Sequence, residues 1–353
     1  MNKKMKILAI ETSCDETAAA VTDNRRVLSN VIFSQINIHK EYGGVYPALA
    51  KRAHKEKIGK VIEKALNNAN IKIKDFGAIA VTFGPGLVIA LEVGLNTAKM
   101  LAEKYKKPLI PVDHIEGHIY SCFAQNRNGH PKRDFVFPFL ASIVSGGTTE
   151  MVIVNDHLEY EVIGKTLDDA AGEALDKAAK ILGLSYPGGP IIEKLAETGN
   201  PNFLKLPLAM VEKGNLDFSY SGVKTAFRRG VDKLSQKEIV KNLNHLCASF
   251  QSAVFEQILR KTNLALLKTG VKNLAVCGGV IANKKLRIDI KKLAKKRGVK
   301  VFFPSFKKLV NDNAAMIGVA AYFKYKNGIY LENNFDRLDR VGRTDLKMWT
   351  KKS

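Results

Sequence analysis

Two histidines four residues apart stand out in the stretch VDHIEGHIY, which covers residues 112–120. On a helix, His114 and His118 would share one face and could bind a single metal ion. The same spacing also fits two polar residues at the start of an ordinary helix. A zinc protease motif needs a glutamate directly after the first histidine, but Ile115 occupies that position and Glu116 follows it. The pattern therefore excludes that motif, and a metal site and a structural role both stay open.

A metal held by two imidazoles needs a third ligand, and Asp312 is the best candidate carboxylate elsewhere in the chain. It lies in LVNDNAAMIG, where we expect Asn311 to cap a helix that Asp312 opens. A simple capping role is the alternative for Asp312. Two imidazoles and a carboxylate with open coordination positions would suit iron or zinc acting as a Lewis acid.

Two glycine pairs each follow an apolar, strand-like run and could approach a phosphate. Gly146 and Gly147 lie in SGGTT, and Gly278 and Gly279 follow NLAVC. Glycine lets backbone N–H groups point into a concavity and come close to an anion. Each pair also fits a plain tight turn, and neither matches a P-loop or a dinucleotide-binding fingerprint.

Acidic residues gather at the start of TLDDAAGEALDKAAK. On a helix, Asp169, Glu173 and Asp176 would lie on one face, where like charges repel. Asp168 and Asp169 also fit a helix N-terminus, where acids interact favourably with the dipole. The small residues around them indicate close approach by another group, such as a ribose or a metal-bound phosphate. The following YPGG predicts a turn whose glycines contact a base or a sugar.

The elements that must position these groups alternate between strand-like and helical patterns, which favours an α/β fold. A hairpin with a polar tip is expected near the N-terminus and another over residues 139–154. Each is followed later by a strand, a glycine turn, a helix and a strand, over 77–112 and 273–304. This repeated order predicts two related halves around a central cleft, the layout of actin-like ATPases and sugar kinases (ASKHA fold). We expect an N-terminal lobe at residues 5–124 plus 310–345 and a C-terminal lobe at 125–309, with the polar stretch QNRNGHPKRD at the boundary.

Composition limits the class of protein. The chain has 353 residues, 46% of them hydrophobic, and a formal net charge of +22. The basic excess makes an anionic partner such as RNA plausible. The apolar run near the N-terminus is too short for a signal peptide, and no stretch is long enough to span a membrane. The four cysteines are scattered, so we expect a cytoplasmic protein with reduced thiols and no membrane partner.

Seven separated motifs agree in order and spacing with one family. They are ETSCDET, HIEGH, SGGTT, DDAAGEALDK with YPGGP, SYSGVKTA, GGVIANKKLR and NDNAAMIG. Together they resemble the tRNA threonylcarbamoyladenosine transferase family (TsaD), formerly called glycoproteases, over roughly residues 5–325.

The resemblance implies an acyltransferase of tRNA modification. It implies transfer of the threonylcarbamoyl group from threonylcarbamoyl-AMP to the N6 amino group of the adenosine beside the anticodon, in tRNAs reading ANN codons. The implied cofactor is one Fe²⁺ or Zn²⁺ per subunit, with Mg²⁺ as a further ion accompanying a nucleotide. The implied partners are tRNA, a degenerate TsaB-like paralogue and a small TsaE-like ATPase.

The resemblance also implies roles for residues at matching positions. The metal ligands would be His114, His118 and Asp312, with Glu116 a bystander. The acidic tip of the first hairpin, Asp15 and Glu16, would be catalytic. The substrate-binding residues would be Ile143, Val144, Ser145, Gly146, Gly147, Asp176, Gly189, Glu193 and Asn283.

Four residues and one loop depart from the family pattern. Thr148 and Glu150 replace the usual histidine and glutamine of the first glycine turn, so an imidazole beside the phosphate is lost. Asn311 and Val310 replace the usual threonine and cysteine before Asp312, and the loop over residues 125–134 is longer than usual. An actin-like small-molecule kinase, or a degenerate member that only binds, remains the alternative function.

Overall fold

Two five-stranded mixed sheets form the framework of the protein. The computed structural model describes residues 5–210, 212, 214–344, 346 and 348–350. The first sheet contains β1 (Lys6–Glu11), β2 (Glu16–Asp23), β3 (Arg26–Ser34), β4 (Ala78–Gly84) and β5 (Leu109–Asp113). The second contains β6 (Phe139–Val144), β7 (Thr149–Asp156), β8 (Glu159–Lys165), β9 (Asn273–Cys277) and β10 (Lys300–Phe302).

The two sheets share one topology. The first has the order β3-β2-β1-β4-β5 and the second, read from the other edge, β8-β7-β6-β9-β10. In each, the first three strands in sequence pair antiparallel, and the last two add in parallel. The predicted pair of related α/β halves is therefore confirmed, although β3 and β8 were not expected.

Successive side chains along each strand of the first sheet point to opposite faces, and each face packs into its own hydrophobic core. Leu8 and Ile10 pack on the side of α2 (Pro47–Ala69) and α3 (Val88–Tyr105). Ile7 and Ala9 face the opposite side, where α4 (His114–Ser121) and α11 (Ala314–Lys326) lie. Because both faces are covered, the central strands β1 and β4 are almost entirely buried.

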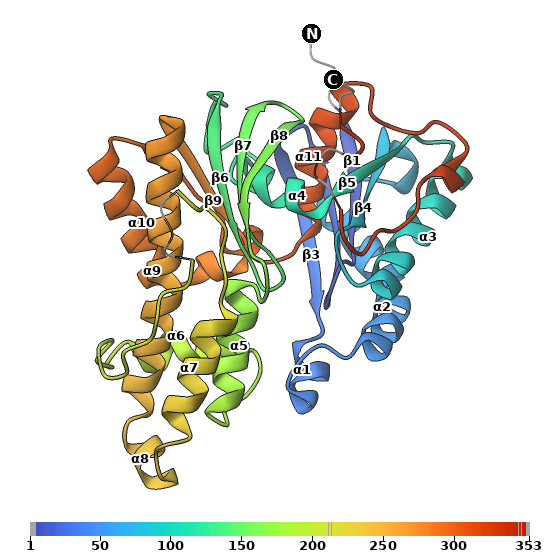
Figure 1. The fold of residues 1–353 in the computed structure, drawn as a ribbon. Coiled ribbons are helices and arrows are strands. Elements are labelled where there is room, and N and C mark those ends of the chain that lie inside the picture. The colour runs from blue at the N-terminus through green and yellow to red at the C-terminus, as the bar shows by residue number, and fades with distance from the viewer. Residues whose placement is uncertain (1–4, 211, 213, 345, 347, 351–353) are drawn as a thin grey trace.

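The layer formed by α4 and α11 is shared by both sheets. Ala141, Ile143 and Cys277 of the second sheet belong to the same buried cluster as Ile7 and Ala9. Figure 1 shows the two helices between the sheets. The helix that carries both histidines is thus held from two sides, at the junction of the two halves.

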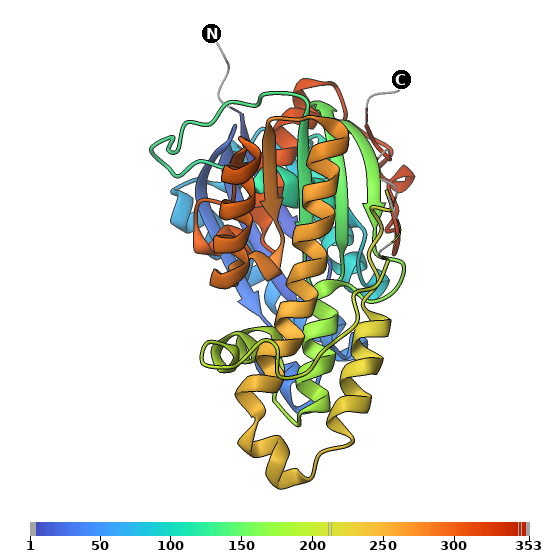
Figure 2. The ribbon, with the colours of Figure 1, turned by 60° about the vertical axis from the view of Figure 1, so that its left-hand side comes forward.

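The other helices cover the outer face of the second sheet or extend below it. In Figure 2 the long α9 runs down that face beside α10. These helices are α5 (Ala171–Ile181), α6 (Gly188–Ala196), α7 (Ser221–Val231), α8 (Gln236–Lys241), α9 (Leu243–Thr269) and α10 (Lys284–Arg297). The short α1 (Ile36–His39) precedes α2, and single 3₁₀ turns lie at Lys40–Tyr42, Ile73–Asp75, Gly279–Ala282, Lys307–Leu309 and Phe335–Arg337.

Two helix starts differ from expectation. The cap of α11 is Asn313, whose Oδ1 accepts a hydrogen bond from the Met316 N–H at 3.0 Å, so neither Asn311 nor Asp312 caps or opens that helix. The YPGG segment also starts a helix, because Gly188 is the first residue of α6.

The polar stretch over residues 125–134 contains no helix or extended strand, as expected for a connecting loop. All strands of the first sheet precede it and all strands of the second follow it. The lobe boundaries themselves stay a prediction. Within the described part of the chain, no helix combines the length and the apolar character that a membrane crossing requires.

Candidate active site

A cleft of about 700 Å³ lies where loops from both sheets meet. Its walls come from the tip of the first hairpin, the start of α4, the turn between β6 and β7, helix α5 and the segment before α11. Among its lining residues are Asp15, Glu16, His114, Ser145, Gly146, Gly147, Thr148, Asp176, Gly279 and Asp312.

The three predicted metal ligands meet at one end of this cleft. One donor atom from each of His114, His118 and Asp312 lies within 4.8 Å of the others, and no second such group occurs within the described residues. Nε2 of His114 is 3.4 Å and Nε2 of His118 is 3.1 Å from the same oxygen, Oδ1 of Asp312. Helix α4 brings the rings together because residues at i and i+4 share a face.

The start of α4 is fixed by its own cap. Oδ1 of Asp113 accepts hydrogen bonds from the N–H groups of Ile115 at 2.7 Å and Glu116 at 3.3 Å. Thr344 donates to the other carboxylate oxygen at 2.5 Å. The helix therefore begins at His114, which directs both imidazoles toward Asp312.

Glu11 is a functional candidate that the sequence analysis missed. Its Oε2 lies 3.1 Å from Nδ1 of His114 and accepts a hydrogen bond from Thr82 at 2.5 Å. Its Oε1 accepts from the backbone N–H of Ser13 at 2.5 Å. A carboxylate behind a metal-binding imidazole commonly fixes the ring and its tautomer. The sequence did carry one signal for this role, because Glu11 ends an apolar strand-like run. An acid expected to be buried there is unusual and needs a partner.

The charges at this end of the cleft depend on one another. Burial alone would lower the pKa of His114, but the carboxylates of Asp312 and Glu11 outweigh it and raise that pKa well above its usual value. Burial lowers the pKa of His118. For Asp312, burial would raise the pKa, but the two imidazoles outweigh it and lower that pKa. The carboxylate is therefore ionised, as a metal ligand must be.

This donor set fits a divalent transition metal. His118 is fully buried, and neither of its ring nitrogens forms a hydrogen bond with the described residues. Its Nε2 comes close to Asp312 without hydrogen-bond geometry. A buried polar atom without a partner is costly, and coordination would satisfy it. Two imidazole nitrogens and one carboxylate oxygen are ligands that iron and zinc accept.

Glu116 takes no part in this cluster. It is 1% exposed, accepts a hydrogen bond from the Tyr160 hydroxyl at 2.8 Å and pairs with Nζ of Lys324 at 2.9 Å. Lys324, on α11, is fully buried. Glu116 therefore joins α4 to α11 and the second sheet, on the side away from the cleft.

The acidic hairpin tip lines the cleft as predicted. Asp15 and Glu16 both contribute to the wall. Burial and the neighbouring carboxylates of Asp15 and Asp312 raise the pKa of Glu16 well above its usual value. Cys14 also lines the cleft and is only partly buried. Burial and the nearby acids raise the pKa of its thiol, which argues against a nucleophilic thiolate.

The first glycine turn opens directly into the cleft. A Cβ atom added at Gly146 or Gly147 would meet no atom within 4 Å. Ser145 closes the turn, because its N–H donates to the Thr148 carbonyl at 2.8 Å. The side chains of Ile143 and Val144, in contrast, are fully buried in β6 and do not line the cleft.

The N-terminus of α5 supports this turn at close range. The N–H groups of Gly172 and Glu173 donate to the carbonyls of Ser145 and Gly146, both at 3.1 Å. A Cβ at Gly172 would lie 2.7 Å from the Ser145 carbonyl oxygen and 2.8 Å from Cα of Gly146. Only glycine at position 172 leaves the turn where it is.

Replacing Gly172 by alanine is expected to displace the turn and weaken binding of a phosphate-bearing ligand there. Overpacking of this kind costs about 1–3 kcal/mol. With AMP as the phosphate-bearing probe, we therefore expect the affinity measured by isothermal titration calorimetry to fall about tenfold. The matched control is Gly222→Ala on α7, where a Cβ meets nothing within 4 Å. Equal affinity of the two variants would contradict the role of Gly172.

The acids of the α5 region are arranged differently from the prediction. Helix α5 begins at Ala171, so Asp169 precedes it and does not share its face. Instead, the carboxylate oxygens of Asp169 form ion pairs with Nζ of Lys177 and Nζ of Lys224, each at 2.5 Å. Asp168 binds the N–H groups of Tyr220 at 2.7 Å and Ser221 at 3.3 Å, at the start of α7.

Asp176 lines the cleft and forms hydrogen bonds to the first residues of α6. Its Oδ1 accepts from the N–H groups of Gly188 at 2.7 Å and Gly189 at 3.1 Å. Burial raises its pKa despite these two donors. Gly189 thus contacts Asp176 but is not itself part of the cleft wall.

Two further predicted substrate-binding residues lie outside the cleft lining. Asn283 is buried, caps α10 through the Leu286 N–H at 3.1 Å and donates to Gln251 at 2.8 Å. Glu193 accepts from the Lys284 N–H at 2.8 Å. Their proposed contacts with a nucleotide stay predictions.

The departures from the family pattern affect the cleft unequally. Thr148 lines it and donates its N–H to the Ser145 hydroxyl at 3.0 Å, which keeps the turn closed without a histidine. Asn311 also lines the cleft, whereas Glu150 lies within β7 and Val310 is buried.

Comparison with known proteins gives one consistent family. The family model TsaD, described as tRNA N6-adenosine threonylcarbamoyltransferase, matches residues 26–319. Proteins named tRNA N6-adenosine threonylcarbamoyltransferase are similar over nearly the whole chain. That of Clostridium beijerinckii is 49% identical, covering 95% of this chain and 97% of its own. That of Clostridium perfringens strain SM101 is 50% identical with 99% coverage of both, and that of Staphylococcus saprophyticus is 44% identical with 96% and 98% coverage.

Solved structures share the fold at low sequence identity. Full-length HypF in a phosphate- and nucleotide-bound form superposes with a TM-score of 0.59 at 15% identity, covering 93% of this chain and 47% of its own. Component A of the (R)-2-hydroxyglutaryl-CoA dehydratase of Acidaminococcus fermentans gives 0.52 at 14% identity, covering 91% and 99%. These likenesses support the predicted actin-like fold and nothing more specific.

Proposed function

The chain belongs to the tRNA N6-adenosine threonylcarbamoyltransferase family, and from that membership we propose that its cleft transfers a threonylcarbamoyl group from threonylcarbamoyl-AMP to adenosine N6 of tRNA. The protein is an enzyme, a transferase of tRNA modification. Its relatives favour neither a small-molecule kinase nor a member that only binds. The observation that carries the detailed proposal is the cleft itself, where a histidine–carboxylate cluster faces an open glycine turn.

The adenylate is a mixed anhydride, so its carbonyl carbon is already activated. The adenosine amine attacks that carbon, a C–N bond forms, the C–O bond to the phosphate breaks and AMP leaves. The amine loses one proton in this step. Asp15 and Glu16 line the cleft and are the carboxylates we assign to accept it. No covalent enzyme intermediate is needed.

The glycine turn supports binding of the phosphate in this scheme. Gly146 and Gly147 leave open space on the cleft side, where backbone N–H groups can approach an anion closely. Asp176 lies on the helix that supports this turn, lines the cleft and hydrogen-bonds to the start of α6. His114, His118 and Asp312 would hold Fe²⁺ or Zn²⁺, which when bound supplies a Lewis acid that polarises a substrate oxygen. Mg²⁺ would accompany the nucleotide.

The finer assignments follow the family resemblance. We propose that the acceptor is the adenosine beside the anticodon in tRNAs reading ANN codons. We also propose that the enzyme works in the cytoplasm with a TsaB-like paralogue and a TsaE-like ATPase. The net charge of +22 agrees with an RNA substrate.

The direct test is reconstitution with the proposed partners. The chain is combined with the TsaB-like paralogue, the TsaE-like ATPase, an adenylate-forming enzyme, threonine, bicarbonate, ATP and tRNA. Modified adenosine is then measured by nucleoside mass spectrometry. We expect modification only of tRNAs that read ANN codons. Absence of modified adenosine, while a homologous system works under the same conditions, would overturn the proposal.

Replacing Glu11 by glutamine is expected to weaken metal binding. The amide keeps the shape of the side chain but removes the charge that faces Nδ1 of His114. Loss of such a supporting group commonly lowers metal affinity about 10–100-fold. Zinc affinity is measured by competition with a chromophoric chelator, with Glu92→Gln, a partly exposed acid on α3, as the control. An unchanged zinc affinity would remove Glu11 from the site.

A further inference from the structure

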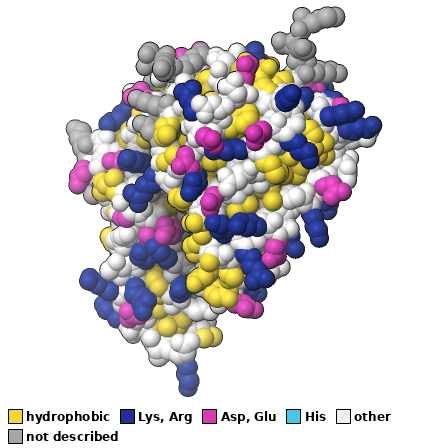
Figure 3. All heavy atoms as spheres, turned by 90° about the vertical axis from the view of Figure 1, so that its right-hand side faces the viewer, with side chains coloured by type: hydrophobic (Ala, Val, Ile, Leu, Met, Phe, Trp, Pro, Cys, Tyr) yellow, Lys and Arg dark blue, Asp and Glu magenta, His cyan; other side chains and the backbone are white. Residues whose placement is uncertain are grey.

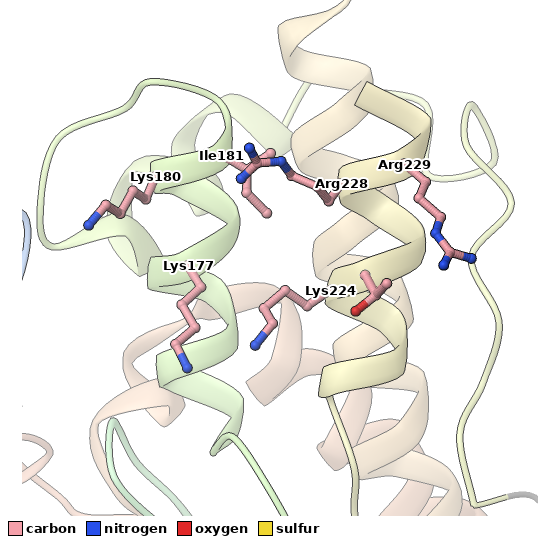
Figure 4. Close-up of a pocket in the computed structure, with 7 residues that line it drawn as sticks. Lys177, Lys180, Ile181, Lys224, Arg228 and Arg229 are labelled. Atoms are coloured by element: carbon pink, nitrogen blue, oxygen red, sulfur yellow. The ribbon is translucent and has the colours of Figure 1, made fainter. Parts of the chain in front are cut away.

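A basic groove runs between α5 and α7, next to the cleft. It encloses about 490 Å³ and is lined by Lys177, Lys180, Ile181, Lys224, Thr225, Arg228 and Arg229. Figure 4 shows Lys177 and Lys180 extending from α5, and Arg228 reaching from α7 toward Ile181. We call this feature the basic groove. The family resemblance gives no role to its α7 wall.

Part of the positive charge in the groove is uncompensated. Lys177 and Lys224 are paired with Asp169. The contact of Arg228 with Asp232 is long, at 3.4 Å, and both side chains are mostly exposed, so it neutralises the guanidinium only weakly. Lys180 forms no ion pair with any described residue. The groove therefore keeps cations available for a ligand's phosphates.

The groove is continuous with the cleft. Lys177 and Lys180 line both cavities. Lys180 also reaches toward the opposite wall, because its Nζ lies 4.0 Å from the position a Cβ on Gly43 would occupy. A polymer with one nucleotide in the cleft can thus continue along α5 and α7.

Two exposed tyrosines flank the opposite wall of the cleft. Gly43 and Gly44 line the cleft, and Tyr42 and Tyr46 stand on either side of them with exposures of 55% and 52%. Their ring centroids are 5.6 Å apart. Exposed aromatic faces beside a basic surface are typical of sites that stack unpaired bases. The face on the right of Figure 1, in contrast, mixes basic, acidic and apolar side chains (Figure 3).

We propose that the basic groove and the tyrosine pair together form the docking surface for the single-stranded anticodon loop of tRNA. The groove holds backbone phosphates on one side of the reacting nucleotide, and Tyr42 and Tyr46 stack bases on the other side. This assignment rests on the proposed function and adds the surface that positions its RNA substrate. Phosphate contacts fix register, and stacking holds the loop with its bases splayed.

The test measures binding of a fluorescent anticodon stem–loop RNA to the full chain across a salt series. The double variant K180A/R228A is expected to bind about tenfold more weakly, and the slope of log affinity against log salt should fall by about 1.4, for two lost phosphate contacts on a single strand. The variant Y42A/Y46A is expected to lose at least about tenfold in affinity with little change in that slope, because stacking is not ionic.

The matched control is K295A/K296A in the last turn of α10, which removes the same charge from exposed positions outside both cavities. A loss in the control equal to that in K180A/R228A, or no loss in either test variant, would overturn the docking surface. Transfer at saturating RNA is measured in parallel. If the wild type transfers the group but the variants bind RNA as tightly as the wild type, only the docking surface is rejected. If the wild type does not transfer the group, the proposed function is rejected.

Discussion

Replacing Asp312 by asparagine is expected to lower threonylcarbamoyl transfer by more than about 100-fold and, on the proposal that it is a metal ligand, to lower the metal content of the purified protein. Its Oδ1 is the atom that both imidazoles face, at 3.4 Å and 3.1 Å. Asparagine keeps the size of the side chain but removes the negative charge that a divalent cation requires. Loss of a group that only supports a metal ligand commonly lowers metal affinity or activity about 10–100-fold, and loss of a ligand itself should lower them further.

The readouts are metal content by mass spectrometry and single-turnover transfer. Asp75→Asn is the control, since Asp75 is exposed at the end of a 3₁₀ turn outside the cleft lining. Circular dichroism tests whether the Asp312 variant keeps its fold. Full metal content together with full activity in Asp312→Asn would show that the cluster of His114, His118 and Asp312 has another role.

The central part of the fold was predictable because its signals are local. The apolar runs of β1, β4, β6 and β9 are buried on both faces, so each reads as a strand without knowledge of its neighbours. The edge strands β3 and β8 were missed because most of their residues are only partly buried or exposed. Such strands carry polar residues that obscure the alternating pattern.

The candidate site was predictable where spacing alone defines it. His114 and His118 lie one helical turn apart, and any helix would bring them together. The cap of α11 was assigned wrongly because Asn311 and Asn313 flank Asp312 and both are good capping residues. Only the backbone path selects Asn313.

Contacts between distant segments could not be predicted from one sequence. Glu11 meets His114 because β1 and β4 are neighbours in the sheet and β5 leads into α4. Lys224 pairs with Asp169 because α5 and α7 lie side by side. In each case the charge that decides the role of an acid comes from a residue many positions away.

Replacing Lys324 by methionine is expected to destabilise the protein by about 3–5 kcal/mol, because it leaves the carboxylate of Glu116 buried without its cation. Lys324 is fully buried, Glu116 is 1% exposed, and their charged atoms are 2.9 Å apart. The Tyr160 hydroxyl remains as a donor at 2.8 Å, but a single neutral hydrogen bond compensates little of a buried charge. The free energy of unfolding is measured by urea titration followed by circular dichroism.

The double variant E116Q/K324M separates a lost charge pair from lost packing. It removes both charges, and the glutamine carbonyl can still accept from Tyr160, so we expect it to recover most of the stability lost in Lys324→Met. Lys308→Met, at an exposed lysine, is the control for adding an apolar side chain. If the single and double variants are equally destabilised, Lys324 stabilises the protein through packing between α4 and α11 and not through its ion pair. Because α4 carries both histidines, the ion pair between Glu116 and Lys324 also holds in place the helix that positions the cluster, through buried groups that do not line the cleft.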